Sequence, residues 1–199
     1  MPSRRVILGG LFAGAVIAPP ASALGKLLTV ERRPSEGFTL SNGLQVVVLP
    51  SRRAPIVSQL LVYKVGSADE VMGQTGVAHF LEHMMFKGTP TVGPSEFSRI
   101  VARHGGRDNA YTDFDSTGYH QTISSDRLEL IMRMEADRMV NLRISERELV
   151  PERQVVAEER RMRIENVPSA QLDEAVREQL YGRGKPYGMP PSGYPADVK

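Results

Sequence analysis

The sequence predicts an α+β fold in which a mostly antiparallel sheet packs against helices. Segments rich in apolar and β-branched residues are mixed with segments of helical spacing, without the strict strand–helix–strand repeat of a parallel sheet. Short β-rich segments are joined directly by tight turns, of which Asn42-Gly43 is the strongest. The chain has 199 residues, 41% hydrophobic and 24% charged, which suits one globular domain with a core.

The first 23 residues have the pattern of an export signal. Arg4 and Arg5 precede an apolar run over residues 6–18, and Ala21-Ser22-Ala23 is a small-residue cleavage site. The run is too short to span a bilayer, so we expect no membrane span after cleavage and a periplasmic location. The paired arginines also resemble a twin-arginine signal, and this route and the Sec route both stay open. An uncleaved anchor is the remaining alternative.

The charge and the cysteine content exclude several classes of protein. Without Arg4 and Arg5 the 25 basic residues fall to 23, which equals the 23 acidic residues, so the sequence has no electrostatic footprint for nucleic acid. The chain contains no cysteine. Disulfides, cysteine-ligated zinc and a lipoprotein anchor are therefore excluded.

The first half of the chain predicts two strand-rich segments followed by two helices. In chain order we expect a linker over 24–36, a hairpin over 38–50, a central strand over 56–65, a buried helix over 77–86 and a second helix over 94–104. The hairpin follows from Asn42-Gly43 between apolar runs. The second helix opens on Pro94-Ser95-Glu96 and is stopped by Gly105-Gly106.

The second half predicts one more hairpin and a series of helices. In chain order we expect strands over 107–114 and 117–124, helices over 126–140, 151–166 and 169–181, and a loop over 182–199. Ser145 and Glu148 have the spacing of a capping box, and Pro151 suits the first turn of the helix that follows. No stop or closing strand precedes Lys199, so we expect a domain over 37–199 that is truncated at its C-terminal end.

The chemical pattern of the sequence is His79-Phe80-Leu81-Glu82-His83. Histidines four residues apart lie on one face of a helix, one turn apart, and can reach one metal ion. Glu82 faces the same way, where a carboxylate can take a proton from a water that zinc has acidified. This order, H-x-x-E-H, is the inverzincin signature. We expect Phe80 and Leu81 to face inward.

Two histidines at this spacing also occur on helices that bind no metal. The flanking residues therefore determine whether the motif is interpreted as a metal site. Gly66 to Glu70 and Gly76 to Thr89, followed by Gly105-Gly106, Asn109 to Thr112 and Asp115-x-Thr117, closely resemble the pitrilysin/insulinase family of zinc peptidases. That family includes the mitochondrial processing peptidases. The resemblance covers most of residues 37–195 and implies the α+β fold of the family's N-terminal domain.

The resemblance implies a third zinc ligand on a distant helix, since zinc in such a centre takes three protein ligands and keeps one open position. Glu158 and Glu159 compete for this role. The family pattern, in register over Glu152 to Met162, places the ligand at Glu159, 76 residues after His83. Glu158 points about 100° away on a helix and is expected to face solvent.

The resemblance also implies roles for Glu152 and for the strand around Tyr111. Glu152 lies two helical turns before Glu159 and is expected to support a ligand or tune the charge of the site. The alternative is a solvated acid at a helix start. Asn109, Ala110 and Tyr111 are expected to bind extended substrate through the backbone. The side chain of Tyr111 can contact a substrate side chain or can be a cross-strand core or surface aromatic, and both interpretations stay open.

The other candidates in the sequence receive structural roles. His104 and His120 have no ligand spacing to the motif, and Met84, Met85 and Phe86 are expected in the core. The predicted activity is hydrolysis of peptides or small unfolded polypeptides by one zinc ion held by His79, His83 and Glu159, with Glu82 as general base.

The resemblance further implies a second homologous domain or subunit that closes around the substrate. Two alternatives stay open. The chain can be a non-catalytic subunit that pairs with a sibling, or a module that binds peptides without cleaving them.

Overall fold

The computed structural model describes residues 35–198, so the predicted export signal over 1–23 and nearly all of the predicted linker lie outside the described residues. The chain divides into two compact units, residues 1–52 and 53–199. In the first unit β1 (Glu36–Thr39) and β2 (Gln45–Val48) pair antiparallel. The turn between them has Gly43 at a φ of 88°, as the Asn-Gly pair predicts, so the hairpin is confirmed.

The second unit contains a three-stranded antiparallel sheet. Its strands are β3 (Ile56–Tyr63), β4 (Arg107–Thr112) and β5 (Thr117–Ser124), in the order β3-β5-β4. The predicted hairpin of β4 and β5 is confirmed. The expectation of a central position for β3 is wrong in this sheet, because β5 takes the centre. Burial alternates along β3, whereas most residues of β5 are buried.

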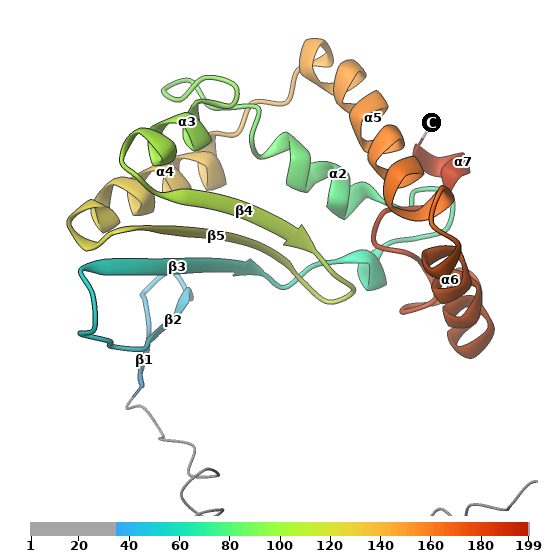
Figure 1. The fold of residues 1–199 in the computed structure, drawn as a ribbon, viewed down its shortest axis with the longest axis horizontal. Helices are drawn as coiled ribbons and strands as arrows, with labels where there is room; N and C mark the ends of the chain where they lie inside the picture. The colour runs from blue at the N-terminus through green and yellow to red at the C-terminus, as the bar shows by residue number, and fades with distance from the viewer. Residues whose placement is uncertain (1–34, 199) are drawn as a thin grey trace, which may run out of the picture. The chain divides into compact units, whose positions relative to one another are not determined.

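The helices of this unit are α2 (Val77–Met84), α3 (Glu96–Arg103), α4 (Leu128–Asn141), α5 (Glu146–Arg160), α6 (Pro168–Tyr181) and α7 (Pro195–Val198). Helices α2, α3 and α4 lie on one face of the three-stranded sheet, whereas α6 and α7 lie beyond its end (Figure 1). α2 contacts β4 and β5, α3 contacts β4, and α4 contacts β5. α5 packs across α2, and a short π-helix over Arg161–Glu165 links it to α6. The architecture is the predicted α+β fold.

Most helix boundaries differ from the sequence prediction by one or two residues, and the start of α5 differs by five. α2 ends at Met84, two residues early. α5 begins at Glu146, so Pro151 lies inside the helix and the expected first-turn position is wrong. The acids Glu146 and Glu148 occupy the first turn and favour the earlier start through the helix dipole, while the side chain of Ser145 makes no capping hydrogen bond.

The C-terminal segment is not entirely loop, because residues 195–198 form the single turn of α7. Within residues 35–198, no helix has the length and the apolar character that crossing a bilayer requires.

The core of the second unit lies between the sheet and helices α3 and α4. Its buried side chains are Phe97, Val101, Ile123, Ile131 and Met134. Separately, Glu70 fixes the start of α2, because its carboxylate accepts hydrogen bonds from the main-chain N–H groups of Gly76 (2.7 Å) and Ala78 (2.8 Å). These are N–H groups that a helix start leaves unpaired. The helix that carries the histidine motif is therefore held at its start and against the sheet.

Candidate metal centre

The motif side chains of α2 line a cavity of about 650 Å³. His79, Glu82 and His83 reach it from one face of the helix, and Glu152 and Glu159 of α5 close it from the other side. The arrangement follows from helical periodicity, since residues three and four apart share a face. The structure thus brings together residues from two helices that lie about 70 positions apart in the sequence.

Three of the predicted ligands form a compact group. One ligand atom from each of His79, His83 and Glu159 lies within 4.8 Å of the others, and in the described part of the chain this is the one group of three such residues. Oε2 of Glu159 is 3.1 Å from Nε2 of His83 and 3.7 Å from Nε2 of His79. Two imidazoles and one carboxylate are a donor set that catalytic zinc takes, so the residues present fit a zinc ion.

The two competing glutamates have different surroundings. The side chain of Glu159 is 17% exposed and faces the histidines, whereas that of Glu158 is 50% exposed and pairs with Arg161. The geometry brings Glu159, and not Glu158, into the group.

Glu152 is buried beside the histidines, which excludes a solvated acid at the helix start. Its Oε1 is 2.9 Å from Nδ1 of His83, and its Oε2 contacts Nζ of Lys87. Burial alone would raise the pKa of Glu152, but the hydrogen bonds from Lys87 and His83 outweigh burial and hold this pKa below its usual value. The residue is therefore an ionised acceptor for the imidazole.

The carboxylate of Glu82 is buried in the same cavity. Burial raises the pKa of Glu82, while a 2.5 Å hydrogen bond donated by the hydroxyl of Thr112 opposes this rise. A carboxylate with a raised pKa is a better proton acceptor near neutral pH. Thr112 belongs to β4, so the sheet fixes the orientation of Glu82.

His79 is largely buried and neutral. Burial, followed by the neighbouring His83, lowers the pKa of His79 to about 4. The neutral imidazole is the form that binds metal ions. Nδ1 of His79 is buried and has no hydrogen-bond partner in the described part of the chain.

Asn109, Ala110 and Tyr111 line the cavity from β4, which lies at the edge of the three-stranded sheet. The ring of Tyr111 lies over Gly118, where an added Cβ would come within 2.4 Å of it. This matches the cross-strand aromatic that the sequence left open. Ala110 and Thr112 alternate with Tyr111 and face the opposite side, toward α2.

Of the residues that were assigned structural roles from the sequence, Phe86 was expected in the core but is only half-buried. His104 and His120 are exposed and stand outside the ligand group, while Met84 and Met85 are buried. Leu81 was expected inward, but it is 42% exposed. The expectation is wrong because Leu81 points away from the metal side of α2 into a second, apolar cavity.

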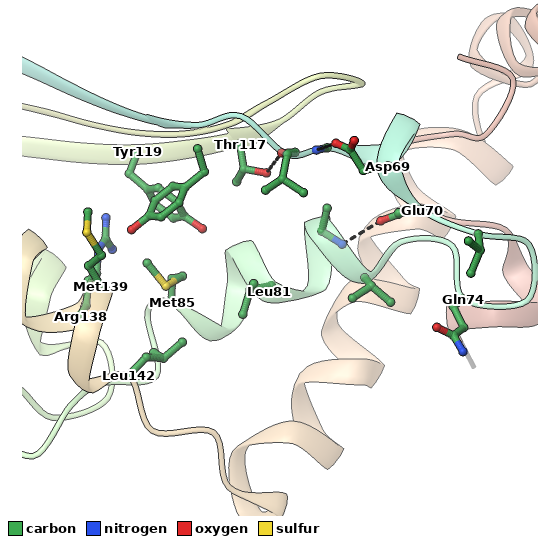
Figure 2. A pocket seen from close by; sticks show the side chains of 16 residues that line it. Asp69, Glu70, Gln74, Leu81, Met85, Thr117, Tyr119, Arg138, Met139 and Leu142 are labelled. Atoms are coloured by element: carbon green, nitrogen blue, oxygen red, sulfur yellow. Dashed lines mark hydrogen bonds between the residues drawn. The ribbon is translucent and has the colours of Figure 1, made fainter. Parts of the chain in front are cut away.

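That second cavity has about 480 Å³ and lies on the other face of α2 (Figure 2). Leu81 of α2 and Met85, which directly follows α2, face Tyr119 of β5 and Arg138 of α4 across it. Arg138 is paired with Glu135 through two hydrogen bonds of 2.7 Å. The walls of this second cavity are mostly apolar, whereas polar side chains line the cavity on the metal side of α2.

Sequence reasoning did not assign three residues that touch the site. Lys87 contacts Glu152, Thr112 donates to Glu82, and Nη1 of Arg163 is 2.9 Å from Oε1 of Glu159. The sequence holds a local signal for two of them. Lys87 follows His83 by four residues and Arg163 follows Glu159 by four, the spacing at which side chains on a helix lie side by side. Thr112 depends on the placement of β4 against α2, which no local pattern gives.

The sequence of the chain is similar to those of known zinc proteases. Residues 46–190 match the family described as insulinase, peptidase family M16. The zinc protease PqqE of Helicobacter pylori is 42% identical over 165 residues, which cover 82% of this chain and 37% of the relative. A Bacillus subtilis protein named uncharacterized zinc protease YmxG is 30% identical over 145 residues, covering 73% of this chain and 35% of its own length.

Solved structures agree in fold. A protease from Helicobacter pylori superposes with a TM-score of 0.78 at 42% identity, over 83% of this chain and 40% of that one. The periplasmic protease PqqL of Escherichia coli has a TM-score of 0.74 at 27% identity, over 82% and 19%. Pitrilysin has a TM-score of 0.75 at 22% identity, over 86% and 18%. The chain belongs to the insulinase family, peptidase family M16.

Proposed function

We propose that this chain is the zinc-binding part of a metalloendopeptidase that hydrolyses peptides or small unfolded polypeptides. His79, His83 and Glu159 hold one zinc ion, and Glu82 is the general base. The observation that carries the proposal is the grouping of three ligand atoms within 4.8 Å, with the buried carboxylate of Glu82 on the same face of α2. The names of the relatives, which are called zinc proteases, support it.

Glu82 carries the proton transfers in this proposal. When bound, zinc supplies a Lewis acid that acidifies water and polarises a carbonyl. Glu82 accepts a proton from the attacking water, aided by the raised pKa of its carboxyl group, and then passes the proton to the leaving amine. The hydroxyl of Thr112 holds the carboxylate in place through both steps.

The substrate is proposed to lie along β4. An edge strand presents unpaired main-chain groups, so an extended peptide can add to the sheet beside the cavity. Asn109, Ala110 and Tyr111 would hold it through their main chain. Because the ring of Tyr111 covers Gly118, this residue is assigned a main-chain contact.

The proposed enzyme contains more polypeptide than this chain. The chain spans 37% of the length of the PqqE relative. We therefore assign residues 37–199 to a zinc-binding domain that works with a second homologous domain, in the same chain or in a partner. The pattern of residues 1–23 and the periplasmic neighbour PqqL support export, by the Sec or the twin-arginine route.

A quenched-peptide assay on the complete proposed enzyme, which joins this chain to its second homologous domain, tests the proposal with and without a chelator. Cleavage is expected to stop with chelator and to return with zinc. Glu82→Gln is expected to keep zinc and to lower the turnover number by about 10²–10⁴-fold, the usual contribution of a general base. Glu158→Gln, a change at an exposed glutamate, is the matched control and should cleave normally.

Other outcomes would contradict the proposal in distinct ways. Normal turnover by Glu82→Gln would refute the assigned base. Peptide binding without cleavage would support a binding module, and the absence of both, with a second protein copurifying, would support a structural subunit.

A further inference from the structure

Lys87 follows His83 by one helical turn and contacts a residue of the neighbouring helix. Nζ of Lys87 contacts Oε2 of Glu152. The other oxygen of that carboxylate, Oε1, is 2.9 Å from Nδ1 of His83. One carboxylate on α5 therefore joins two side chains from α2 and the turn after it. Each of its oxygens has a different partner.

The main chain around Lys87 is fixed on both sides. The carbonyl oxygen of Phe86 accepts a 2.9 Å hydrogen bond from the main-chain N–H of Ser95. The carbonyl oxygen of Gly88 accepts one of 3.1 Å from the main-chain N–H of Arg143. Gly88 has a φ of 105°, and an added Cβ would lie 2.5 Å from a backbone oxygen, so glycine permits this turn. The ammonium group of Lys87 thus extends from a well-held point of the backbone.

Glu152 needs a cationic partner where it lies. Its side chain is 9% exposed, and a carboxylate removed from water is stable only when paired and hydrogen-bonded. With Lys87 at Oε2, Oε1 is left facing His83. The opposite nitrogen of His83, Nε2, is 3.1 Å from Oε2 of Glu159 and faces the proposed metal position.

We propose that Lys87 is a positioning residue for the metal centre. By holding Oε2 of Glu152, it turns Oε1 toward Nδ1 of His83, and this fixes the imidazole with Nε2 directed at the metal. A carboxylate that accepts the second N–H of a ligating histidine sets both its tautomer and its ring orientation. The inference rests on the proposed function and adds the residue that aligns one of its ligands.

A purely structural lysine would behave differently. If Lys87 only neutralised a buried charge, its loss would lower the stability of the chain and leave the affinity for zinc unchanged. A positioning residue must change zinc affinity through Glu152, so its effect must vanish once Glu152 has lost its charge.

The test is zinc affinity of the full chain, measured by competition with a chromophoric chelator, for Lys87→Met, Lys87→Arg, Glu152→Gln and the double variant Lys87→Met/Glu152→Gln. Lys87→Met is expected to weaken zinc binding about 10–100-fold, as the loss of an outer partner does. Lys87→Arg keeps the cation and should recover most of the affinity. The double variant should bind zinc no more weakly than Glu152→Gln alone.

A second readout works on the zinc-free protein. Nitrogen NMR of the His83 ring should show the proton on Nδ1 in the wild type and a mixture of tautomers in Lys87→Met. Thermal unfolding of both proteins monitors the fold. If Lys87→Met does not fold, Lys87→Gln, which keeps a donor without the charge, takes its place in both measurements.

Two results would overturn the inference, and they are distinguishable. If the wild type binds one zinc ion and Lys87→Met binds it equally tightly, Lys87 has no positioning role while the metal centre stands. If the wild type binds no zinc, the proposed metal centre falls as well.

Discussion

Glu158 and Glu159 are neighbours in the sequence with opposite surroundings. A step of one residue turns the helix by about 100°, which takes one carboxylate to the histidines and the other to Arg161 at the surface. Since the backbone of α5 is the same for both, the pair offers a chemically matched comparison. The two differ in access to the metal position, in exposure and in the arginine that each one contacts.

We predict that Glu159→Gln weakens zinc binding by more than the 10- to 100-fold that is typical for an outer partner, because it removes a direct ligand. Glu158→Gln should bind zinc like the wild type. Isothermal titration with zinc measures both. Equal affinities for the two variants would show that Glu159 is not a ligand.

At the scale of the residue, the sequence predicted the ligand group and its supporting residue Glu152, but not the contacts of Lys87 and Thr112. His79, Glu82 and His83 could be placed together because helical spacing is a local property. Glu159 needed the resemblance to choose between two adjacent acids. Thr112 could not be found, because its hydrogen bond to Glu82 depends on how a strand packs against a helix.

At the scale of the element, α4 contributes Ile131 and Met134 to the core between the sheet and the helices. Ile131 is fully buried in the cluster with Phe97 and Val101, whereas its neighbour Met132 is 53% exposed. Both residues lie inside the same helix. Substitutions at the two positions therefore distinguish what core packing contributes to the free energy of unfolding from what helix propensity contributes.

Ile131→Ala is predicted to lower the free energy of unfolding by about 2–5 kcal/mol, the usual cost of a cavity left by a large core side chain. Met132→Ala should change it by less than about 0.5 kcal/mol, as surface substitutions do. Urea unfolding followed by circular dichroism measures both values. Similar losses in the two variants would show that the core does not lie under this face of α4.

The helices and strands that could be predicted from the sequence are those with signals confined to a few neighbouring residues. The hairpin at Asn42-Gly43 and the pair β4–β5 follow from turn residues and alternation, both of which are read within a few positions. The edge position of β3 and the outward direction of Leu81 depend on which segments pair and pack across the chain. An apolar side chain predicts a contact, but not the face on which the contact is made.

At the scale of the whole molecule, the C-terminal segment is tied to the start of the motif helix. Asp197 accepts hydrogen bonds from the hydroxyl (2.6 Å) and the main-chain N–H (3.1 Å) of Thr75, which precedes α2. The hydrogen bonds from the side chain and then the backbone of Thr75 lower the pKa of Asp197. The contact joins residues 122 positions apart.

This contact predicts a pH dependence. The pKa of Asp197 is lower in the folded chain, so its stabilisation is present above the ordinary aspartate pKa of about 4 and is lost as the pH falls below that value. In zinc-free protein, the wild type should melt at a higher temperature than Asp197→Asn at neutral pH, and the two melting temperatures should converge in acid. A constant difference at every pH would contradict this assignment.

The two faces of α2 have opposite character. One carries the polar group of His79, Glu82 and His83, and the other lines an apolar cavity with Leu81 and Met85. The central claim concerns the first face: two histidines of α2 and one glutamate of α5 form a single zinc centre. The proposed base and the proposed role of Lys87 both depend on it.

Zinc content combined with X-ray absorption at the zinc edge tests this claim most directly. The full chain, purified and dialysed against zinc-free buffer, should retain one zinc ion with two imidazole nitrogens and a carboxylate oxygen as ligands, at about 2.0–2.2 Å. The double variant His79→Ala/His83→Ala should retain none. One zinc ion retained by that variant, or a spectrum without imidazole ligands in the wild type, would contradict the account.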